Sequence, residues 1–394
     1  MSETHWRKMA LAEALARPDI QARLQAALDS GPLCDHCLGR LLAQVDTGLG
    51  NEERGRRARA AMAAPPPPDL CSLCRGLLAD MEPWVAKARR AVEGWEFDTL
   101  AVSSHSNPRL VEREEALWKL TGPDLAEPYK QAFNRLLGTR LCDELGREVD
   151  LKNPDIIFYA DHRKRRVTVR VEPLFACGRY RKLVRGISQC RWPQWPTSVQ
   201  EVIGDPVLAA AGAEDHLFHG CGREDVDVRC LGERPFTLEV IHPHRRQLDW
   251  DDLARTINQS GKVEVVGLAR CKREAVARLK GMRPEKSYRV LVHLAAPVDD
   301  AALARLAGLV GVIRQQTPTR VLRRRPDLVR PRRIHTLQWR RVDAQTLEID
   351  VRTQAGTYIK ELISGDGGRT VPSVAEVLGV PAVCEELDVS AIHL

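Results

Sequence analysis

The sequence predicts an α+β protein with at least two domains. Its 394 residues exceed the usual length of one domain, which is about 100 to 200 residues. Segments with helical periodicity are interspersed with short runs that alternate apolar and polar residues, as half-buried strands do. Two Cys-x-x-Cys motifs near the N-terminus indicate a bound metal ion. We therefore expect a metal-stapled N-terminal accessory domain, residues 1–190, followed by a second domain, residues 191–394.

The two Cys-x-x-Cys motifs predict a structural zinc site. Cys34 and Cys37 form the first motif, and Cys71 and Cys74 form the second. Each motif supplies two thiolates from one tight turn, and four thiolates complete a tetrahedral zinc site without an open position for a substrate. His36 is a weaker candidate ligand, and a redox pair or two unrelated cysteine pairs are the alternatives. We interpret the remaining seven of the eleven cysteines as buried or incidental.

The N-terminal half also contains predicted helices and strands. Apolar residues at near-helical intervals predict one helix over residues 6–28. Four prolines after Ala64 predict an exposed spacer inside the zinc-binding segment, which we place at about residues 30–78. Further helices are expected over 82–93 and in most of 109–146, and strands over 97–102, 153–160 and 167–173.

In the C-terminal half, a tryptophan- and proline-rich segment over 191–196 predicts a hinge that docks the two halves. Helices and strands are expected over 199–208, 236–240, 251–260, 288–294, 300–309, 347–354 and 357–363.

Charge predicts a polyanionic partner. The net charge is only +7, but basic residues cluster at 162–166, 179–185 and 320–333. Such clusters repel themselves unless anions lie against them, so nucleic acid is the expected partner. No apolar run approaches the roughly 18 to 20 residues that span a bilayer, and no signal peptide begins the chain. We expect a soluble cytoplasmic protein without membrane contact, and a monomer because no heptad pattern is present.

A basic loop at residues 222–229 carries the candidate reactive group. Asp225 and Asp227 lie among arginines, and opposite charge favours the ionised carboxylate that a nucleophile or base requires. Tyr288, Tyr358 and Lys360 are further candidates near strand ends. The alternatives are a loop whose ion pairs only fix its shape, core tyrosines and a surface lysine. No phosphate-binding loop, dinucleotide fingerprint or nucleophile elbow is present, which argues against S-adenosylmethionine and nicotinamide enzymes.

Longer motifs resemble the archaeal and eukaryotic tRNA pseudouridine synthases that modify T-loop uridines. They are GREDVDVR at 222–229, KSY at 286–288, QTPTRVLRRR at 316–325, TQAGTYIKEL at 353–362 and GDGGRTVPS at 365–373. Residues 153–156 and 178–186 resemble the THUMP-containing accessory module of that family. The resemblance covers nearly the whole chain. It implies a THUMP-like domain over about 80–175 and a C-terminal synthase domain with a mixed, largely antiparallel sheet and flanking helices.

The resemblance also implies residue roles. Asp225, preferred over Asp227, would be the catalytic aspartate, and Lys360 would pair with its carboxylate. Tyr288 would stack on the target base, and the other expected substrate-binding residues are Arg223, Tyr358 and Leu362, with Leu362 packed beneath the pocket. The expected RNA contacts are Arg179, Arg181, Lys182, Arg320, Arg323 and Arg324.

The expected activity is isomerisation of uridine to pseudouridine at T-loop position 54, with position 55 as a second candidate, without a catalytic cofactor. Three roles are open to Asp225: attack on the sugar, addition to the base, and removal of a sugar proton. One alternative is a tRNA-binding or chaperone protein that has the same fold but no catalysis. Another is a THUMP-containing thiolation or methylation enzyme, which would need a cofactor-binding domain. The chain lacks the further cysteine-rich insertion of many archaeal relatives, so no second metal site is predicted.

Overall fold

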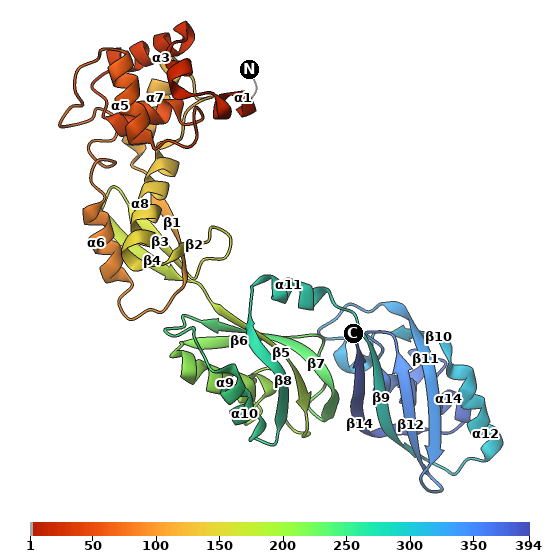
Figure 1. The fold of residues 1–394 in the computed structure, drawn as a ribbon. Helices are drawn as coiled ribbons and strands as arrows, with labels where there is room; N and C mark the ends of the chain where they lie inside the picture. Colours follow the sequence, from red (N-terminus) through yellow and green to blue (C-terminus); the bar gives the residue numbers. More distant parts are fainter. Residues whose placement is uncertain (1–2) are drawn as a thin grey trace. The chain divides into compact units, whose positions relative to one another are not determined.

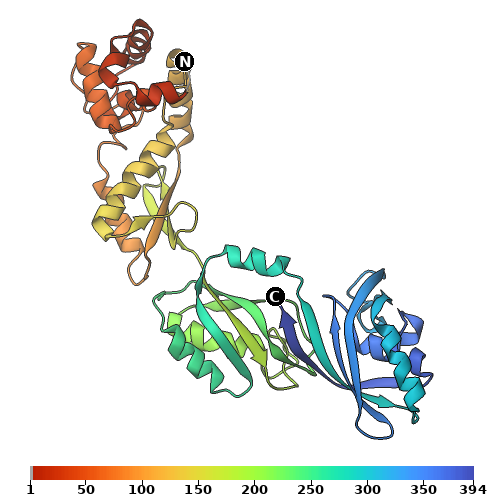
Figure 2. The same ribbon diagram turned by 45° about the vertical axis from the view of Figure 1, so that its right-hand side comes forward.

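The computed structural model describes residues 3–394, and the chain divides into two compact units, Met1–Glu172 and Pro173–Leu394. The predicted boundary near residue 190 is wrong. Strand β5 (Leu174–Lys182) pairs with both β7 (Val228–Ile241) and β8 (Val263–Cys271), so it is an inner strand of the second unit (Figures 1 and 2). The Trp-Pro segment therefore lies within that unit and is not a hinge between units.

The first unit begins with short helices. The predicted single helix over 6–28 is three helices, and Pro18, which lacks an amide hydrogen, begins the third of them. Helices α4 and α5 approach so closely that a Cβ on Gly55 would lie 1.9 Å from the carbonyl oxygen of Asp35. The bounds are α1 (Glu3–Lys8), α2 (Leu11–Leu15), α3 (Pro18–Asp29), α4 (Asp35–Gly39), η1 (Arg40–Leu42) and α5 (Asn51–Ala61).

The rest of the first unit is a four-stranded sheet with three helices. The strand order is β2-β1-β3-β4, with β1 parallel to β2 and β3, and with β3 and β4 forming an antiparallel hairpin. One hydrophobic core joins these elements to the N-terminal helices. The bounds are α6 (Glu82–Ala91), β1 (Thr99–His105), α7 (Pro108–Thr121), α8 (Tyr129–Leu145), β2 (Glu148–Val149), β3 (Ile156–Asp161) and β4 (Arg166–Val171).

A ten-stranded sheet forms the second unit. Its order is β13-β10-β11-β12-β9-β14-β7-β5-β8, with β6 also paired to β7. Only the pairing of β14 with β7 is parallel, which confirms the predicted mixed, largely antiparallel sheet. The remaining strands are β6 (Asp215–Gly220), β9 (Glu285–Leu294), β10 (Gly311–Gln316), β11 (Val329–Arg341), β12 (Thr346–Thr353), β13 (Thr370–Val371) and β14 (Ala382–His393).

Helices cover the two halves of this sheet separately, and each half has its own core. Helices α9 and α10 lie against the half that contains β5–β8, and α12 and α14 lie against the other half (Figure 1). The bounds are α9 (Val199–Ala211), α10 (Trp250–Asn258), α11 (Glu274–Gly281), α12 (Asp300–Ala304), η2 (Arg305–Leu309), η3 (Thr319–Val321), α13 (Ile359–Ser364), η4 (Asp366–Gly368) and α14 (Val374–Leu378).

The register at the centre of the sheet positions the candidate site. Cys230 of β7 pairs with Val389 of β14, and Val389 pairs in turn with Tyr288 of β9. The loop that precedes β7 therefore emerges beside Tyr288, where the two halves of the sheet meet.

Two further features complete the fold. Cys177 and Cys271 form a disulfide between β5 and β8. The prediction that these two cysteines are buried or incidental is therefore wrong, since both are half-buried and bonded to each other. Within residues 3–394, no helix is both long enough and apolar enough to cross a membrane.

Candidate active site and metal centre

A cavity of about 400 Å³ opens at the centre of the second unit. Its wall combines the loop before β7, the start of β9, the segment after β10 and the start of α13. Of the residues proposed from the sequence, it contains Arg223, Asp225, Tyr288, Arg320, Tyr358 and Lys360. Residues from four distant parts of the chain thus converge at one site.

Arg320 and Lys360 hold the two aspartates of this loop. Arg320 Nη1 lies 3.0 Å from Asp225 Oδ2, and Nε of the same side chain lies 2.7 Å from Glu361. Lys360 Nζ lies 2.7 Å from Asp227 Oδ2 and 3.5 Å from Asp225 Oδ2. Arg320, predicted only as an RNA contact, is therefore the nearer partner of Asp225.

Ionisation of Asp227 follows from the same geometry. Burial opposes the charged carboxylate, but the hydrogen bonds and the positive charge of Lys360 outweigh it and lower the pKa of Asp227. Lys360 therefore spans both carboxylates, with its shorter contacts on Asp227.

A buried network fixes the backbone of the loop. The carboxylate of Glu224 lies 3.1 Å from Arg234 Nη2 and accepts a hydrogen bond from the Tyr180 hydroxyl at 3.1 Å. Arg234 Nη1 also donates to the carbonyl oxygen of Cys221 at 2.9 Å. Burial disfavours the charged guanidinium, yet the charge of Glu224 raises the pKa of Arg234 above its ordinary value. The pair therefore anchors the loop to β7 and β5.

Lys182 belongs to this network and does not face solvent. Its side chain is fully buried, and its ammonium group donates to the carbonyl oxygens of Asp225 at 3.2 Å and Val226 at 3.0 Å. The prediction that Lys182 contacts RNA is therefore wrong, because the pairing of β5 inside the sheet turns this side chain under the loop. Burial lowers the pKa of Lys182.

The aromatic candidates take different positions. Tyr288 is buried at the floor of the cavity, and burial raises the pKa of its hydroxyl to about 12. Tyr358 is at the rim, where its hydroxyl accepts a hydrogen bond from Arg325 Nη1 at 3.2 Å. Leu362 is fully buried in the core and does not line the cavity, as expected of a residue packed beneath it.

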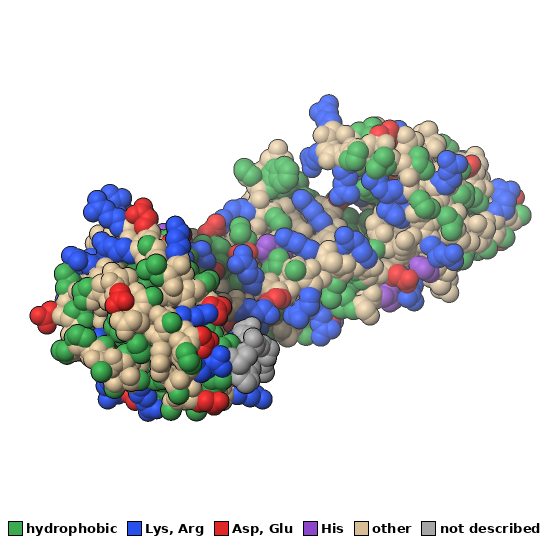
Figure 3. Space-filling model, turned by 90° about the horizontal axis from the view of Figure 1, so that it is seen from above, with side chains coloured by type: hydrophobic (Ala, Val, Ile, Leu, Met, Phe, Trp, Pro, Cys, Tyr) green, Lys and Arg blue, Asp and Glu red, His purple; other side chains and the backbone are tan. Residues whose placement is uncertain are grey.

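The other proposed RNA contacts differ in their availability. Arg181 is ion-paired to Glu233 at 2.8 Å and Glu264 at 3.0 Å, and Arg179 lies 3.2 Å from Glu233. Arg323 and Arg324 are exposed. Figure 3 shows Lys and Arg side chains around a hollow in the second unit, at the right of the view. The arginine segment after β10 therefore presents more unpaired positive charge than β5 does.

Some of this arrangement lies outside the reach of sequence patterns. Gln189 donates to the carbonyl oxygen of Gly222 at 2.9 Å and to the Tyr180 hydroxyl at 2.9 Å, so a residue before the Trp-Pro segment touches the loop at residues 222–229. The one local signal was the glycine-punctuated loop itself. Its partners come from strands whose pairing no local pattern specifies.

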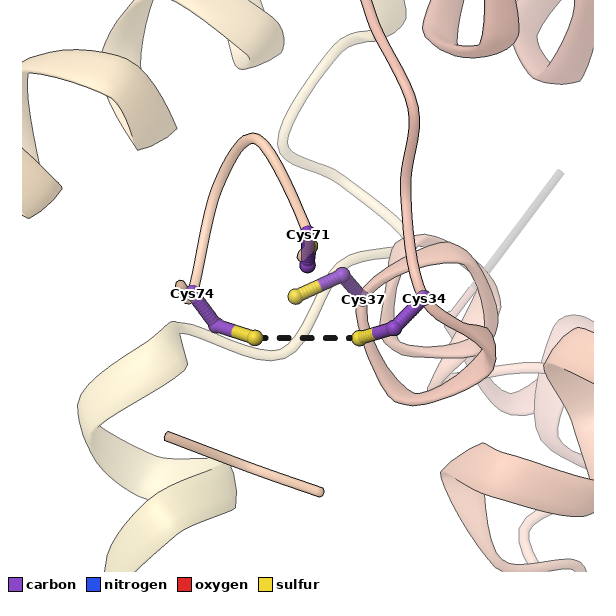
Figure 4. Close-up of side chains that lie close together, drawn as sticks. All are labelled: Cys34, Cys37, Cys71 and Cys74. Carbon is purple, nitrogen blue, oxygen red and sulfur yellow. Dashed lines mark hydrogen bonds between the residues drawn. The ribbon is translucent and has the colours of Figure 1, made fainter. Parts of the chain in front are cut away.

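The four proposed zinc ligands converge in the first unit. The sulfur atoms of Cys34, Cys37, Cys71 and Cys74 all lie within 4.8 Å of one another. Figure 4 shows the four side chains pointing together, with Cys34 Sγ and Cys74 Sγ 3.7 Å apart. Zinc–sulfur bonds of about 2.3 Å in a tetrahedron place two sulfur atoms roughly 3.8 Å apart. The cluster therefore fits a tetrahedral metal ion.

Backbone contacts hold the two cysteine motifs together. Cys34 precedes α4, Cys37 lies in it, and the amide of Ser72 donates to the carbonyl oxygen of Pro32 at 2.8 Å. Arg59 of α5 donates to the carbonyl oxygen of Leu33 at 2.6 Å and contacts Asp35 at 2.7 Å. The His36 ring lies 3.5 Å from Glu52 and is not a member of the cluster.

Known proteins resemble the chain over nearly its full length. The family model described as "Pus10, C-terminal" matches residues 175–393, and "Pus10 THUMP domain, archaeal" matches residues 84–161. The tRNA pseudouridine synthase Pus10 of Methanothrix thermoacetophila is 37% identical and covers 94% of each chain. That of Pyrococcus furiosus is 36% identical, over 94% of this chain and 97% of the relative. These matches confirm the predicted family, and the chain belongs to the Pus10 family of pseudouridine synthases.

Proposed function

We propose that this protein isomerises uridine to pseudouridine in the T-loop of tRNA, at position 54, with position 55 as a second candidate. The observation that carries the proposal is the cavity in which the Asp225 carboxylate shares a wall with Tyr288 and is bounded by arginines. Relatives that align over nearly the whole chain are named tRNA pseudouridine synthases.

The reaction conserves all atoms of the nucleotide. The bond between N1 of the base and C1′ of the sugar breaks, and a bond between C5 and C1′ forms. One proton leaves C5 and one arrives at N1, so neither an oxidant nor a reductant is required. The protein must therefore hold the detached base, let it turn, and supply one ionised group beside it.

The cavity supplies these requirements. A uridine must leave its base stack to reach Asp225, and an aromatic face at Tyr288 compensates for the stacking it loses. Arg320 and Lys360 place positive charge 3.0 and 3.5 Å from the Asp225 carboxylate. We assign Asp225 as the reactive carboxylate, and Lys360 as the cation that couples Asp225 to Asp227.

Replacing each aspartate by asparagine tests this assignment. In the Asp225→Asn variant we expect tRNA binding within about threefold of wild type and no pseudouridine in an unmodified tRNA transcript. The matched Asp227→Asn variant should keep measurable product, because it loses the contact to Lys360 but not the reactive group. Equal product from Asp225→Asn and wild type would overturn the assignment. Tight binding without product in the wild-type chain would instead favour a tRNA-binding protein without catalysis.

We propose that the four-cysteine cluster holds one zinc ion with a structural role. Four thiolates saturate the ion, so it would supply folding free energy and no catalysis. Metal analysis of the purified protein should give about one zinc per chain, and none in the Cys34→Ser/Cys71→Ser variant. Full zinc content in that variant would refute the ligand set.

We further propose that the protein works as a cytoplasmic monomer whose partner is tRNA. The exposed arginine segment, residues 320–333, supports RNA as the partner. Sedimentation of the purified chain checks the oligomeric state.

A further inference from the structure

A second cavity, of about 520 Å³, adjoins the first. The two cavities share Arg223, Asp225, Arg320, Val321 and Arg325 in their walls. The far wall of the second cavity is formed by Trp192, Gln194 and Trp195. A ligand in the first cavity that is part of a longer chain would therefore continue into the second.

The tryptophans belong to a loop whose base is fixed. We call residues 188–198 the tryptophan loop. Ser188 and Ser198 form a β-bridge at its two ends, and the amide of Val199 donates to the carbonyl oxygen of Ser188 at 2.9 Å. Next to this bridge, Gln189 donates to the carbonyl oxygen of Gly222. The loop is thus tied directly to the backbone that carries Asp225.

The tip of the loop presents aromatic surface. Trp192 and Trp195 remain 37% and 40% exposed, and the amide of Trp195 donates to the carbonyl oxygen of Trp192 at 3.0 Å. Burial of a tryptophan side chain is strongly favourable, so two exposed tryptophans beside a cavity are unusual. Their exposed rings suit a flat partner that covers them.

Charge around the second cavity selects an anionic partner. Arg324 lies over the Trp192 ring, with its Cζ 5.7 Å from the ring centroid. Arg223, Arg324 and Arg325 form no ion pair with a carboxylate in the part of the chain that the structure describes. Aromatic faces among unpaired guanidinium groups are the combination that binds unpaired nucleotides, because bases stack and phosphates pair with arginine.

We propose that the tryptophan loop is a binding site for the nucleotide that adjoins the target uridine in the RNA chain. Its base stacks on Trp192 or Trp195, and Arg324 and Arg325 contact the adjoining phosphate. By holding the nucleotide next to the target, the site positions the RNA so that the target uridine enters the first cavity beside Asp225. This inference rests on the proposed function, because it takes the first cavity as the uridine site.

Removing a base from the RNA and the tryptophans from the protein tests this site. T-loop hairpin RNAs are prepared intact and with an abasic nucleotide on the 5′ or the 3′ side of the target. Their dissociation constants are measured with the full-length Asp225→Asn chain, so that the RNA stays unmodified. The same RNAs are measured after Trp192→Ala/Trp195→Ala is added, and after Trp192→Phe/Trp195→Phe, which keeps aromatic faces.

We expect the loss of affinity caused by the missing base to depend on whether the two tryptophans are present. One abasic RNA should bind the tryptophan-containing chain roughly 5- to 100-fold more weakly than the intact RNA, and the alanine variant should bind both RNAs equally. The phenylalanine variant should keep most of the discrimination. Leu217→Ala truncates an exposed apolar side chain on β6 outside both cavities, and should leave the discrimination unchanged. A variant that weakens the binding of every RNA equally leaves the ratio of its affinities for intact and abasic RNA unchanged.

Two outcomes would overturn the proposal: equal binding of all three RNAs by the tryptophan-containing chain, or the same discrimination by the alanine variant. Pseudouridine formation by the wild-type chain in the intact hairpin is measured in parallel. Product without this discrimination refutes the tryptophan site alone, whereas discrimination without product refutes the proposed function and leaves RNA binding at the loop.

Discussion

Individual buried side chains fix the loop that carries Asp225. Lys182 supplies the ammonium group beneath the loop, and Glu224 supplies the carboxylate that joins Arg234 to Tyr180. Hydrogen bonds to charged groups contribute about 1.5 to 3 kcal/mol each, and an unsatisfied buried carbonyl costs about 1 to 3 kcal/mol. The geometry of Asp225 therefore depends on buried residues that hold the backbone of its loop.

Lys182→Met tests this positioning role. The methionine fills the space but cannot donate to the carbonyl oxygens of Asp225 and Val226. We expect the free energy of unfolding to fall by about 1 to 3 kcal/mol. We also expect kcat to fall at least tenfold while KM for tRNA changes less than threefold. Lys262→Met, at an exposed position next to β8, is the control. A variant whose KM rises while kcat is unchanged would indicate an RNA contact instead.

His162 makes the first unit sensitive to acid. The side chain is 5% exposed, and its ring lies among Trp84, Tyr129 and Phe133. Neither ring nitrogen has a hydrogen-bond partner within residues 3–394. Burial lowers the pKa of His162 to about 4, from about 6.5 in the unfolded chain. Below pH 6.5 the unfolded chain binds a proton that the folded chain excludes, so stability present at higher pH is lost as the pH falls towards 4.

The predicted loss is at most about 3 kcal/mol between pH 7 and 4, at about 1.4 kcal/mol per pKa unit. Urea unfolding at several pH values measures it. His162→Phe should remove this contribution and flatten the stability of the first unit across that window, whereas a variant as acid-sensitive as wild type would show that other groups cause the effect.

At the scale of elements, the sequence predicted those features that depend on neighbouring residues. The ranges expected from the sequence correctly indicated the strands β3, β4, β9 and β12 and the helices α6, α9 and α10. The cysteine spacing correctly predicted that four sulfur atoms lie together. These patterns are local, since the period of a strand or helix is written in a few consecutive residues.

Pairing between distant strands is what the sequence could not specify. The basic run at 179–185 predicts RNA contacts, but β5 lies between β7 and β8, which buries Lys182 and joins Cys177 to Cys271. The Trp-Pro segment is predicted to be a hinge, but it lies beside Asp225. Strand pairing in the sheet determines this position, and the local sequence does not show it. Arg320 is predicted as an RNA contact, but the sequence does not show that it pairs with Asp225, which lies in the distant loop before β7.

The crossing of α4 and α5 gives a prediction at this scale. A methyl group on Gly55 would overlap the carbonyl of Asp35, which follows Cys34 of the proposed zinc site. Gly55→Ala should separate the helices, lower the free energy of unfolding by about 1 to 3 kcal/mol and weaken zinc retention against a chelator. Gly48→Ala, where a Cβ meets no atom within 4 Å, is the matched control. Equal zinc retention in both variants would show that the helix crossing does not support the metal site.

At the scale of the whole molecule, membership of the Pus10 family and the geometry of the cavity both support the proposed pseudouridine synthase activity. The C-terminal family model and the second unit cover nearly the same residues, and the cavity that contains Asp225 lies where the two halves of that unit's sheet meet. The first unit contributes the four-cysteine cluster and the THUMP match. Chemistry is thus assigned to the second unit, and the first unit supplies an accessory module.

The most direct test is to map pseudouridine in an unmodified tRNA transcript after incubation with the full-length chain and with Asp225→Asn. The wild-type chain should produce pseudouridine at T-loop position 54, or at positions 54 and 55, and Asp225→Asn should produce none. Pseudouridine confined to another region of the tRNA, or equal product from both chains, would contradict the account.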